Sequence, residues 1–324
     1  MIFADMMGGR SLCIWPFLES IVYIVGLHIE AMECRASRQE IGDPIFEWLA
    51  ARVSGNKMLE SSYMKGIWNI SLTYQPLPGE RLFRYEVLLV QTDLGQGASY
   101  ASSKFSGDLS SLVGKTVASV QAMDMLDYPL KVAILDSVYA SFPLRKADYE
   151  AHLSGVSNEK AVSRAQMIYL ETSRLLNIKK SKNMIKGEKP AILNIGYVSK
   201  FRNIMKDQFP HDFLATDLYE GIVGHALDGI TIEDGNSRNE EFMRKADVAI
   251  ITGMTIATGT LSRLLNMARK YATSVIIFAE TGYNLAPYYL NFGADAVICE
   301  EFPYYIFNGF STVKVYRESN PLTP

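Results

Sequence analysis

The residues with the clearest chemical potential follow an apolar run at Val248–Ile251. Within a short stretch the chain places two glycines and four hydroxyl side chains: Thr252, Gly253, Thr255, Thr258, Gly259 and Thr260. Hydroxyl oxygens accept the free N–H groups of a helix's first turn, so we expect Thr258 or Thr260 to cap the helix that follows. Capping does not explain all four threonines, and Thr252, Gly253 and Thr255 are therefore candidates to line a ligand site.

A second candidate is Glu280, which follows the apolar run 274–279 and precedes Thr281. A carboxylate at a strand end, desolvated by Tyr197 and Tyr283, would have a raised pKa, and it would act as a general base or bind an ammonium group. The alternative is a solvated loop acid. We take Glu280 as the candidate catalytic residue and Thr281 as its neighbour in the ligand site.

Two further candidate positions follow earlier apolar runs. Gly196 and Tyr197 precede a helix expected to begin near Ser199, whose free N–H groups would suit an anion, although a plain turn has the same pattern. Asp217 comes about 20 residues later, where an acid accepts hydrogen bonds from a ribose in dinucleotide-binding folds. No G-x-G-x-x-G motif accompanies Asp217, which weakens this interpretation. We therefore keep S-adenosylmethionine, NAD or another nucleoside as the alternative ligand.

The residue types that usually bind metals or act as nucleophiles show no functional spacing. We therefore predict no metal site built from side chains and no Ser-His or Cys-His pair, and we expect Cys299 simply to pack. The residues concerned are widely scattered: His28, His152, His211, His225, Cys13, Cys34 and Cys299.

The elements that must position the candidates alternate between strand and helix. Apolar runs predict strands at 191–196, 213–217, 247–253, 274–280, 295–299 and 312–316. Helices between such strands imply a mostly parallel sheet with right-handed crossovers, whose ligand lies at the carboxyl ends of the strands. The sequence thus predicts a Rossmann-like α/β domain over residues 190–318.

The first half of the chain has a different pattern. A helix is expected after Asp43 as N-cap, and three strand-like stretches at 68–74, 85–92 and 95–100 predict an antiparallel meander. Helical segments follow up to Phe142. We predict an N-terminal α+β domain over residues 1–150, with an extra N-terminal helix.

The segment 151–189 is predicted to join the two domains. Its first part has the apolar spacing of a long amphipathic helix, 157–178, and its second part is rich in lysine. We expect the lysines to form a solvated linker rather than a phosphate or nucleic-acid patch, because no aromatic residues interleave with them.

Composition sets the broad class of protein. The 324 residues carry a net charge of −3 and 48% hydrophobic residues, which gives no global attraction to nucleic acid or an anionic membrane. The apolar segment 12–32 is interrupted by Pro16, Glu19 and Glu30, so we read it as a buried or docking helix rather than a membrane anchor. We predict a soluble, cytoplasmic protein.

Aromatic residues are dense near the C-terminus, which suggests a homodimer or, equally, packing on the first domain. The residues are Tyr288, Tyr289, Tyr304, Tyr305 and Phe307.

The stretch from Ala246 to Tyr271, followed by Leu285-Ala286-Pro287 and Phe292–Val297, resembles the C-terminal domain of the family described as putative heavy-metal chelation. Leu94–Tyr100 and Tyr128–Lys131 resemble its first domain, and the likeness covers roughly Ser62 to Arg317. The resemblance implies an enolase N-terminal-like domain paired with a Rossmann-like domain, and the family's name suggests binding of a metal or its chelate.

The sequence departs from the family pattern at three places. Ala279-Glu280-Thr281-Gly282 stands where a glycine-proline-serine turn is expected, Tyr197-Val198-Ser199 replaces a His-Phe-Pro, and Lys131 replaces an acid. Two of these changes fall at strand ends, so we expect the function to differ from the family's at Glu280 and Tyr197.

Three hypotheses follow. The first is a protein that binds a small charged, amino-acid-like or metal-chelating molecule between the two domains. The second is an enzyme that uses S-adenosylmethionine or another nucleoside cofactor to make or modify such a molecule, with Asp217 on the ribose and Glu280 as the base. The third is a structural subunit whose cleft is vestigial.

Overall fold

A computed structural model describes residues 43–75, 83–101, 107–123, 126–142, 146–303 and 306–318, all within one compact unit. The helix expected within residues 1–42 lies outside the described residues, as do Tyr304 and Tyr305. Within the described ranges, no helix is both long and apolar enough to cross a membrane.

The N-terminal region is an α+β unit, as predicted. It contains a three-stranded antiparallel sheet of β1 (Met64–Tyr74), β2 (Phe83–Thr92) and β3 (Gln96–Ala101). Its helices are α2 (Pro44–Val53), α3 (Lys57–Ser61), η1 (Ser110–Leu112), α4 (Val117–Gln121) and α5 (Tyr128–Tyr139). Helix α5 packs on β2 and β3, and Leu88 and Val90 of β2 belong to the same buried core as α5.

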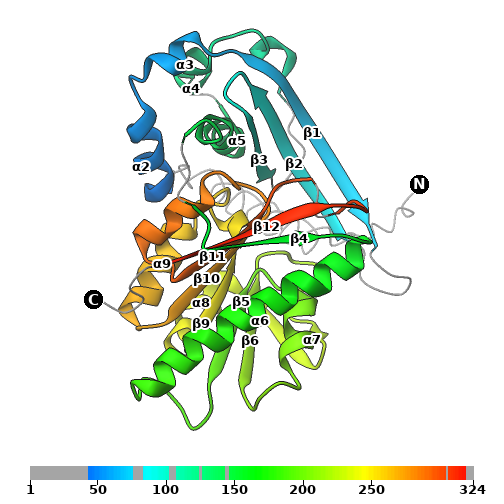
Figure 1. The fold of residues 1–324 in the computed structure, drawn as a ribbon, viewed down its shortest axis with the longest axis vertical. Coiled ribbons are helices and arrows are strands. Elements are labelled where there is room, and N and C mark those ends of the chain that lie inside the picture. The colour runs from blue at the N-terminus through cyan, green and yellow to red at the C-terminus, as the bar shows by residue number, and fades with distance from the viewer. Residues whose placement is uncertain are drawn as a thin grey trace, which may run out of the picture. The chain divides into compact units, whose positions relative to one another are not determined.

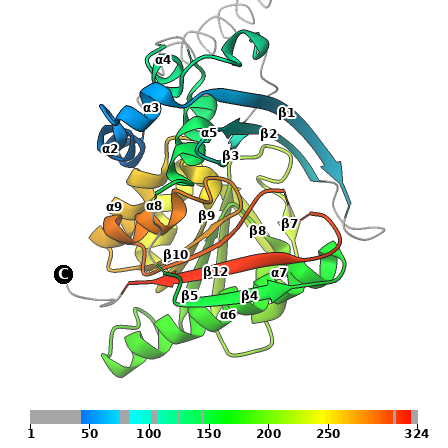
Figure 2. The same ribbon diagram turned by 45° about the horizontal axis from the view of Figure 1, so that its top comes forward.

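The second region is built on a nine-stranded sheet with the order β4-β12-β11-β10-β9-β5-β6-β8-β7 (Figures 1 and 2). Strands β5, β6, β8, β9, β10 and β11 are parallel to their neighbours in this series, whereas β12, β4 and β7 pair antiparallel. Continuous apolar runs such as Val248–Ile251 are buried on both faces, as the sequence predicted. The strands span Tyr149–Leu153 (β4), Ala191–Ile195 (β5), Asp212–Asp217 (β6), Ala226–Leu227 (β7), Ile230–Asp234 (β8), Val248–Thr252 (β9), Ser274–Ala279 (β10), Ala296–Glu300 (β11) and Ser311–Arg317 (β12).

Helices cover both faces of this sheet. Helices α6 (Ser157–Ser181) and α7 (Ser199–Met205) lie on one face, and α8 (Gly235–Lys245) and α9 (Leu261–Lys270) lie on the other (Figure 1). The short 3-10 helices η2 (Gly253–Thr255) and η3 (Ala286–Phe292) follow β9 and β10. The α/β fold class predicted from the sequence is confirmed.

Helix α6 carries charged side chains within its buried stripe. Lys160, Arg164 and Lys179 are buried beside the apolar residues Ile168 and Leu175 at helical spacing. Sequence patterns place charged residues on the solvent side of a helix, so this stripe was not predicted.

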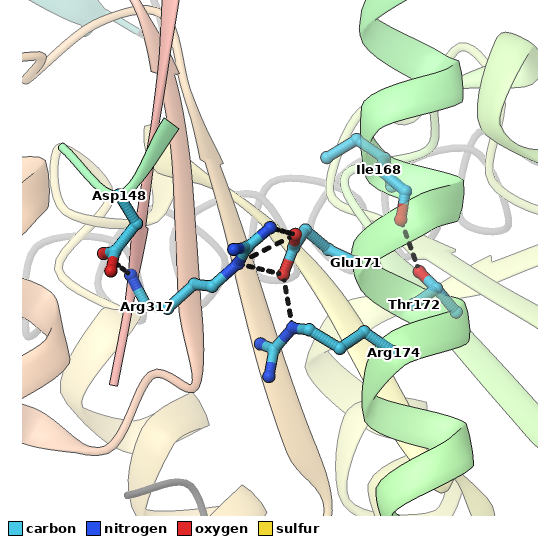
Figure 3. Close-up of polar contacts among 6 residues, drawn as sticks. All are labelled: Asp148, Ile168, Glu171, Thr172, Arg174 and Arg317. Atoms are coloured by element: carbon cyan, nitrogen blue, oxygen red, sulfur yellow. Dashed lines mark hydrogen bonds and ion pairs between the residues drawn. The ribbon is translucent and has the colours of Figure 1, made fainter. Parts of the chain in front are cut away.

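Glu171 fixes α6 to the edge of the sheet (Figure 3). Its carboxylate accepts a hydrogen bond from Nε of Arg317 on β12 at 3.0 Å and another from Nε of Arg174 at 2.8 Å. The backbone N–H of Arg317 in turn donates to the side chain of Asp148. Strand β4, which directly precedes α6, pairs with β12, so both elements pack with the large sheet.

The expectation of a solvated lysine linker was wrong for two residues. Lys179 is buried, and its ammonium donates to the carbonyl of Ala272 at 2.6 Å. Lys186 donates to the carbonyl of Ala246 at 2.6 Å, beyond the end of α8. These cations satisfy carbonyl groups that the helix and turn leave free, so their role is structural.

Two buried aspartates join the N-terminal region to the large sheet. Asp43 caps α2 by accepting from Ile45 N–H, and it also accepts from the N–H of Ser262 in the first turn of α9 at 2.9 Å. The predicted cap by Thr258 or Thr260 was therefore wrong: Thr260 is the N-cap residue, but its side chain makes no cap hydrogen bond.

Asp136 is the second of these aspartates. Its carboxylate accepts from the backbone N–H groups of Ala98 on β3 at 2.9 Å and of Asn284 at 2.8 Å, and from Leu285 at 3.2 Å. The side-chain amide of Asn284 returns a hydrogen bond to the carbonyl of Asp136. One carboxylate thus fastens β3 and α5 to the loop after β10.

The C-terminal aromatics differ in their exposure, and Phe307 is exposed. Tyr289 is fully buried, and Tyr288 packs edge-on against Tyr139 of α5 with ring centroids 4.8 Å apart. Tyr288 and Tyr289 thus pack within the chain, as one of the two explanations predicted, and the homodimer stays a prediction.

Candidate functional site

The predicted site residues lie along one edge of the parallel sheet. The register pairs Ile195 with Ile251 and Thr252 with Phe278, so Gly196, Thr252 and Glu280 end three neighbouring strands. Asp217 ends the next strand, β6. The topology therefore brings together residues that are separated by more than 80 positions in the sequence.

The two glycines at this edge are required by close approach of the backbone. A Cβ atom on Gly196 would lie 2.4 Å from Cγ2 of Thr252, and one on Gly253 would lie 2.5 Å from Cβ of Ala279. Such distances exclude any side chain without a shift of the strand ends.

Substituting Gly253 with alanine is therefore expected to destabilise the protein by about 1–3 kcal/mol, because β9 and β10 must move apart. Urea unfolding followed by circular dichroism measures the change. Gly187→Ala is the matched control, since its added Cβ would be in ordinary contact at 3.5 Å. Equal stability of the two variants would show that the strand ends can separate freely.

The threonines mainly satisfy the turn after β9. Thr255 is buried, and its hydroxyl donates to the carbonyl of Thr252 at 2.8 Å. The hydroxyl of Thr252 accepts from the N–H of Met254, which places it as the cap of η2. Thr281 is buried in the loop after β10. The turn accounts for the hydroxyls of Thr252 and Thr255, and their contact with a ligand remains a prediction.

Glu280 belongs to a cluster of four charged side chains. Arg164 of α6 donates from Nη1 to Oε2 of Glu300 at 2.9 Å, and its Nε lies 3.8 Å from Oε1 of Glu280. Glu300 ends β11 one position beyond the Ala279–Cys299 pair, next to Glu280 at the end of β10. Lys160 is buried one helical turn before Arg164. The side chain of Glu280 is 22% exposed, whereas those of Arg164 and Glu300 are 7% and 0% exposed.

The surroundings of Glu280 favour its protonated form. Burial is the main cause, the negative charge of Glu300 adds to it, and Arg164 opposes both, so that the pKa rises to about 8. A carboxyl group with a pKa near neutrality can donate or accept a proton under ordinary conditions. The raised pKa agrees with the predicted desolvation of this carboxyl group, and the charge of Glu300 adds a cause that the sequence did not predict.

A pH dependence of stability follows from this shift. The pKa of Glu280 is higher in the folded state than its ordinary value of 4.5, so the folded protein binds more protons between about pH 4.5 and 8. The stability of the folded protein must then fall as pH rises through this window, by up to about 1.4 kcal/mol per pH unit from this group.

Glu280→Gln is expected to flatten the decline, as measured by urea unfolding at several pH values. Asp136, whose burial raises its pKa to about 7, contributes a slope of the same sign in both proteins. A variant with the wild-type slope would show that Glu280 is ionised throughout the range.

Tyr197 and Asp217 are held by other partners. The hydroxyl of Tyr197 donates to Asp228 at 2.6 Å, and Asp228 also accepts from the hydroxyl of Ser199. Asp217 accepts from the N–H of Tyr197 through Oδ2 and from the N–H groups of Leu218 and Tyr219 through Oδ1. Asp217 thus holds the ends of β5 and β6 together, and its contact with a ribose remains a prediction.

Strand β3 of the N-terminal region crosses this edge. The N–H of Gly282 donates to the carbonyl of Ala98 at 2.8 Å, which places β3 beside the end of β10. Two residues later, burial and the nearby Asp217 and Tyr219 raise the pKa of Tyr100. The candidate site is therefore bordered by β3 as well as by the strand ends of the large sheet.

Sequence reasoning missed Lys160 and Arg164, and it considered Glu300 only as a possible metal donor next to Cys299, not as a neighbour of Glu280. A usable signal was present, because Lys160, Arg164 and Ile168 are spaced by four residues and so share a face of α6.

Within the part of the chain that the structure describes, no group of three or more His, Cys, Asp or Glu side chains is placed to hold a metal ion.

Comparison with known proteins supports the predicted resemblance. Residues 222–283 match the model of the family described as putative heavy-metal chelation. The fold is similar to that of a family protein of unknown function from Desulfitobacterium hafniense DCB-2, with a TM-score of 0.51 and 14% identity over 83% of this chain and 98% of that one.

A family protein of unknown function from Pyrococcus horikoshii also matches, with a TM-score of 0.48 and 14% identity over 85% of this chain and 99% of that one. No curated protein matches the sequence. The structural likeness concerns the fold alone, because the identity is low.

Proposed function

We propose, from the family match over residues 222–283 and the geometry of the sheet edge, that this chain binds a small charged molecule of an amino-acid-like or metal-chelating kind. The site would lie at the carboxyl ends of β5, β9 and β10, beneath β3. Open α/β sheets bind their ligands at this edge.

The observation that carries the proposal is the position of Glu280. Its carboxyl group is partly open to solvent at the predicted edge, yet it lies against the buried ion pair of Arg164 and Glu300. The carboxyl group of Glu280 can be charged or neutral near neutral pH, and it lies beside the charges of Arg164 and Glu300. Such a group is suited to recognise a charged ligand.

The enzymatic alternative has less support. A nucleoside ligand was expected to use Asp217, whose two carboxylate oxygens already accept three backbone hydrogen bonds. Catalysis by Glu280 needs a substrate held beside it, and the site geometry alone does not name one. The domain boundaries, a cytoplasmic location and a homodimer likewise remain proposals; light scattering after size-exclusion chromatography tests the last.

Isothermal titration calorimetry tests the proposal. The probes are L-histidine, citrate, the Ni²⁺ complexes of both, S-adenosylmethionine and NAD. Binding of an amino acid or chelate that weakens at least about tenfold in Glu280→Gln is expected, since a charged hydrogen bond is worth about 1.5–3 kcal/mol. Glu150→Gln, an exposed acid on β4, is the control.

Two results would contradict the proposal. One is unchanged affinity for every binding probe in Glu280→Gln. The other is binding of S-adenosylmethionine or NAD alone, lost in Asp217→Ala, which would establish the nucleoside alternative instead.

A further inference from the structure

Glu300 presents a buried carboxylate oxygen with no donor. The side chain is fully buried, its Oε2 accepts from Arg164 at 2.9 Å, and its Oε1 has no hydrogen-bond partner. Leaving a buried charged acceptor unpaired costs more than the net value of a normal hydrogen bond. A further hydrogen-bond donor that reached Oε1 of Glu300 would therefore be bound strongly.

Three of the described elements place charged groups near this oxygen. Helix α6 contributes Lys160 and Arg164, β10 contributes Glu280, and β11 contributes Glu300 itself with the neighbouring thiol of Cys299. Burial raises the pKa of Cys299, so this thiol stays neutral. Two cations then face two carboxyl groups, and the cluster is formally neutral when both acids are ionised.

With Glu280 protonated the same cluster carries one positive charge. A bound ammonium group beside ionised Glu280 gives the same total charge. Replacing the proton by an ammonium group is therefore an exchange at constant charge, which avoids the cost of adding net charge to a buried cluster.

We propose that Glu280 and the unpaired Oε1 of Glu300 together accept the N–H groups of a ligand's ammonium, so that the site selects amines over their amine-free analogues. This inference rests on the proposed function and names the chemical class of its ligand. Glu280 provides the access, because its side chain is partly exposed, whereas Glu300 lies behind it and is fully buried.

The exchange balances without any further reactant. The carboxyl group of Glu280 releases its proton to solvent, the ligand keeps its ammonium protons, and charge-assisted hydrogen bonds form from nitrogen to the two carboxylates. No covalent bond is made or broken apart from this O–H bond. At pH values below the pKa of Glu280, the affinity for an amine is expected to increase about tenfold for each unit by which the pH rises. The reason is that the proton and the ammonium group compete for the carboxylate of Glu280.

Methylammonium chloride is the direct probe, because it carries the ammonium group alone. Thermal unfolding is compared at equal concentrations of methylammonium, tetramethylammonium and sodium chloride. Tetramethylammonium has the same charge but no N–H donor. Methylammonium is expected to raise the melting temperature of the wild type relative to both controls, and more so near pH 8 than near pH 6.

Two variants make the test specific. Glu300→Gln and Glu280→Gln should each abolish the methylammonium effect, whereas exposed Glu150→Gln should retain it. Glu280→Gln keeps the Arg164–Glu300 pair and therefore serves where Glu300→Gln fails to fold. Calorimetry with L-histidine and with imidazole propionate, which lacks its amine, in two buffers of different ionisation enthalpy should show proton release for L-histidine alone.

The inference is overturned if methylammonium and tetramethylammonium act equally, or if Glu280→Gln retains the methylammonium effect. Failure of the proposed function gives a different pattern, in which methylammonium stabilises the wild type but no amino acid or chelate binds. Amine-free probes that bind as well as their amines support the proposed function and overturn the ammonium site.

Discussion

Replacing Arg164 with methionine is expected to lower the free energy of unfolding by about 3–5 kcal/mol near pH 8, because it leaves a buried carboxylate without its cation. Arg164 is buried and donates to fully buried Glu300 at 2.9 Å, with Glu280 on its other side. Methionine preserves much of the side-chain volume, so the loss reports on charge rather than on a cavity.

The cost of Arg164→Met should shrink on acidification. Near pH 5 Glu280 is protonated, because its pKa is raised to about 8, so fewer negative charges are left without their cation. Urea unfolding at both pH values measures this, with exposed Arg263→Met as a control expected to change stability by less than about 0.5 kcal/mol. A loss that is small and independent of pH would show that the pair contributes no net stability.

Asp136→Ala is expected to have a comparable effect, with a loss of about 3–5 kcal/mol. The substitution removes the acceptor of three backbone N–H groups, one on β3 and two in the loop after β10. Those donors stay buried at the junction, where each unsatisfied group costs about 1–3 kcal/mol.

Differential scanning calorimetry measures the Asp136 effect, and exposed Asp207→Ala is the control. Because Asp136 joins two regions, hydrogen exchange should also speed up at Ala98, Asn284 and Leu285 in the variant. A stable variant with unchanged protection at these amides would mean that water replaces the carboxylate without cost.

The sequence was sufficient to predict the parallel strands β5, β6, β9, β10 and β11 and the residues at their ends, but it did not predict β8, which pairs parallel with β6. Continuous apolar runs such as Val248–Ile251 have one structural solution in an α/β protein, and the residues that follow them must share an edge. This is why Gly196, Thr252, Gly253 and Glu280 lie together as expected.

The partners of those residues could not be predicted, because they come from distant elements. Arg164 and Glu300 are 136 positions apart, and only the packing of α6 on the sheet brings them together. The short edge strand β4 was also missed: three of its five residues are exposed, so its sequence lacks the apolar pattern of the central strands.

The two departures from the family pattern have different consequences. Glu280 enters a charged cluster at the candidate site, whereas the hydroxyl of Tyr197 is taken up by Asp228 in the turn between β7 and β8. The charged neighbours of Glu280 are Arg164 and Glu300, which the sequence did not predict. Of the two positions, Glu280 is the one for which we propose contact with a ligand.

A crystal structure of the protein soaked with the tightest-binding calorimetric probe tests the central claim most directly. We expect ligand density at the carboxyl ends of β5, β9 and β10, within hydrogen-bond distance of the Glu280 carboxylate. Density at another place, with none beside Glu280, would contradict it.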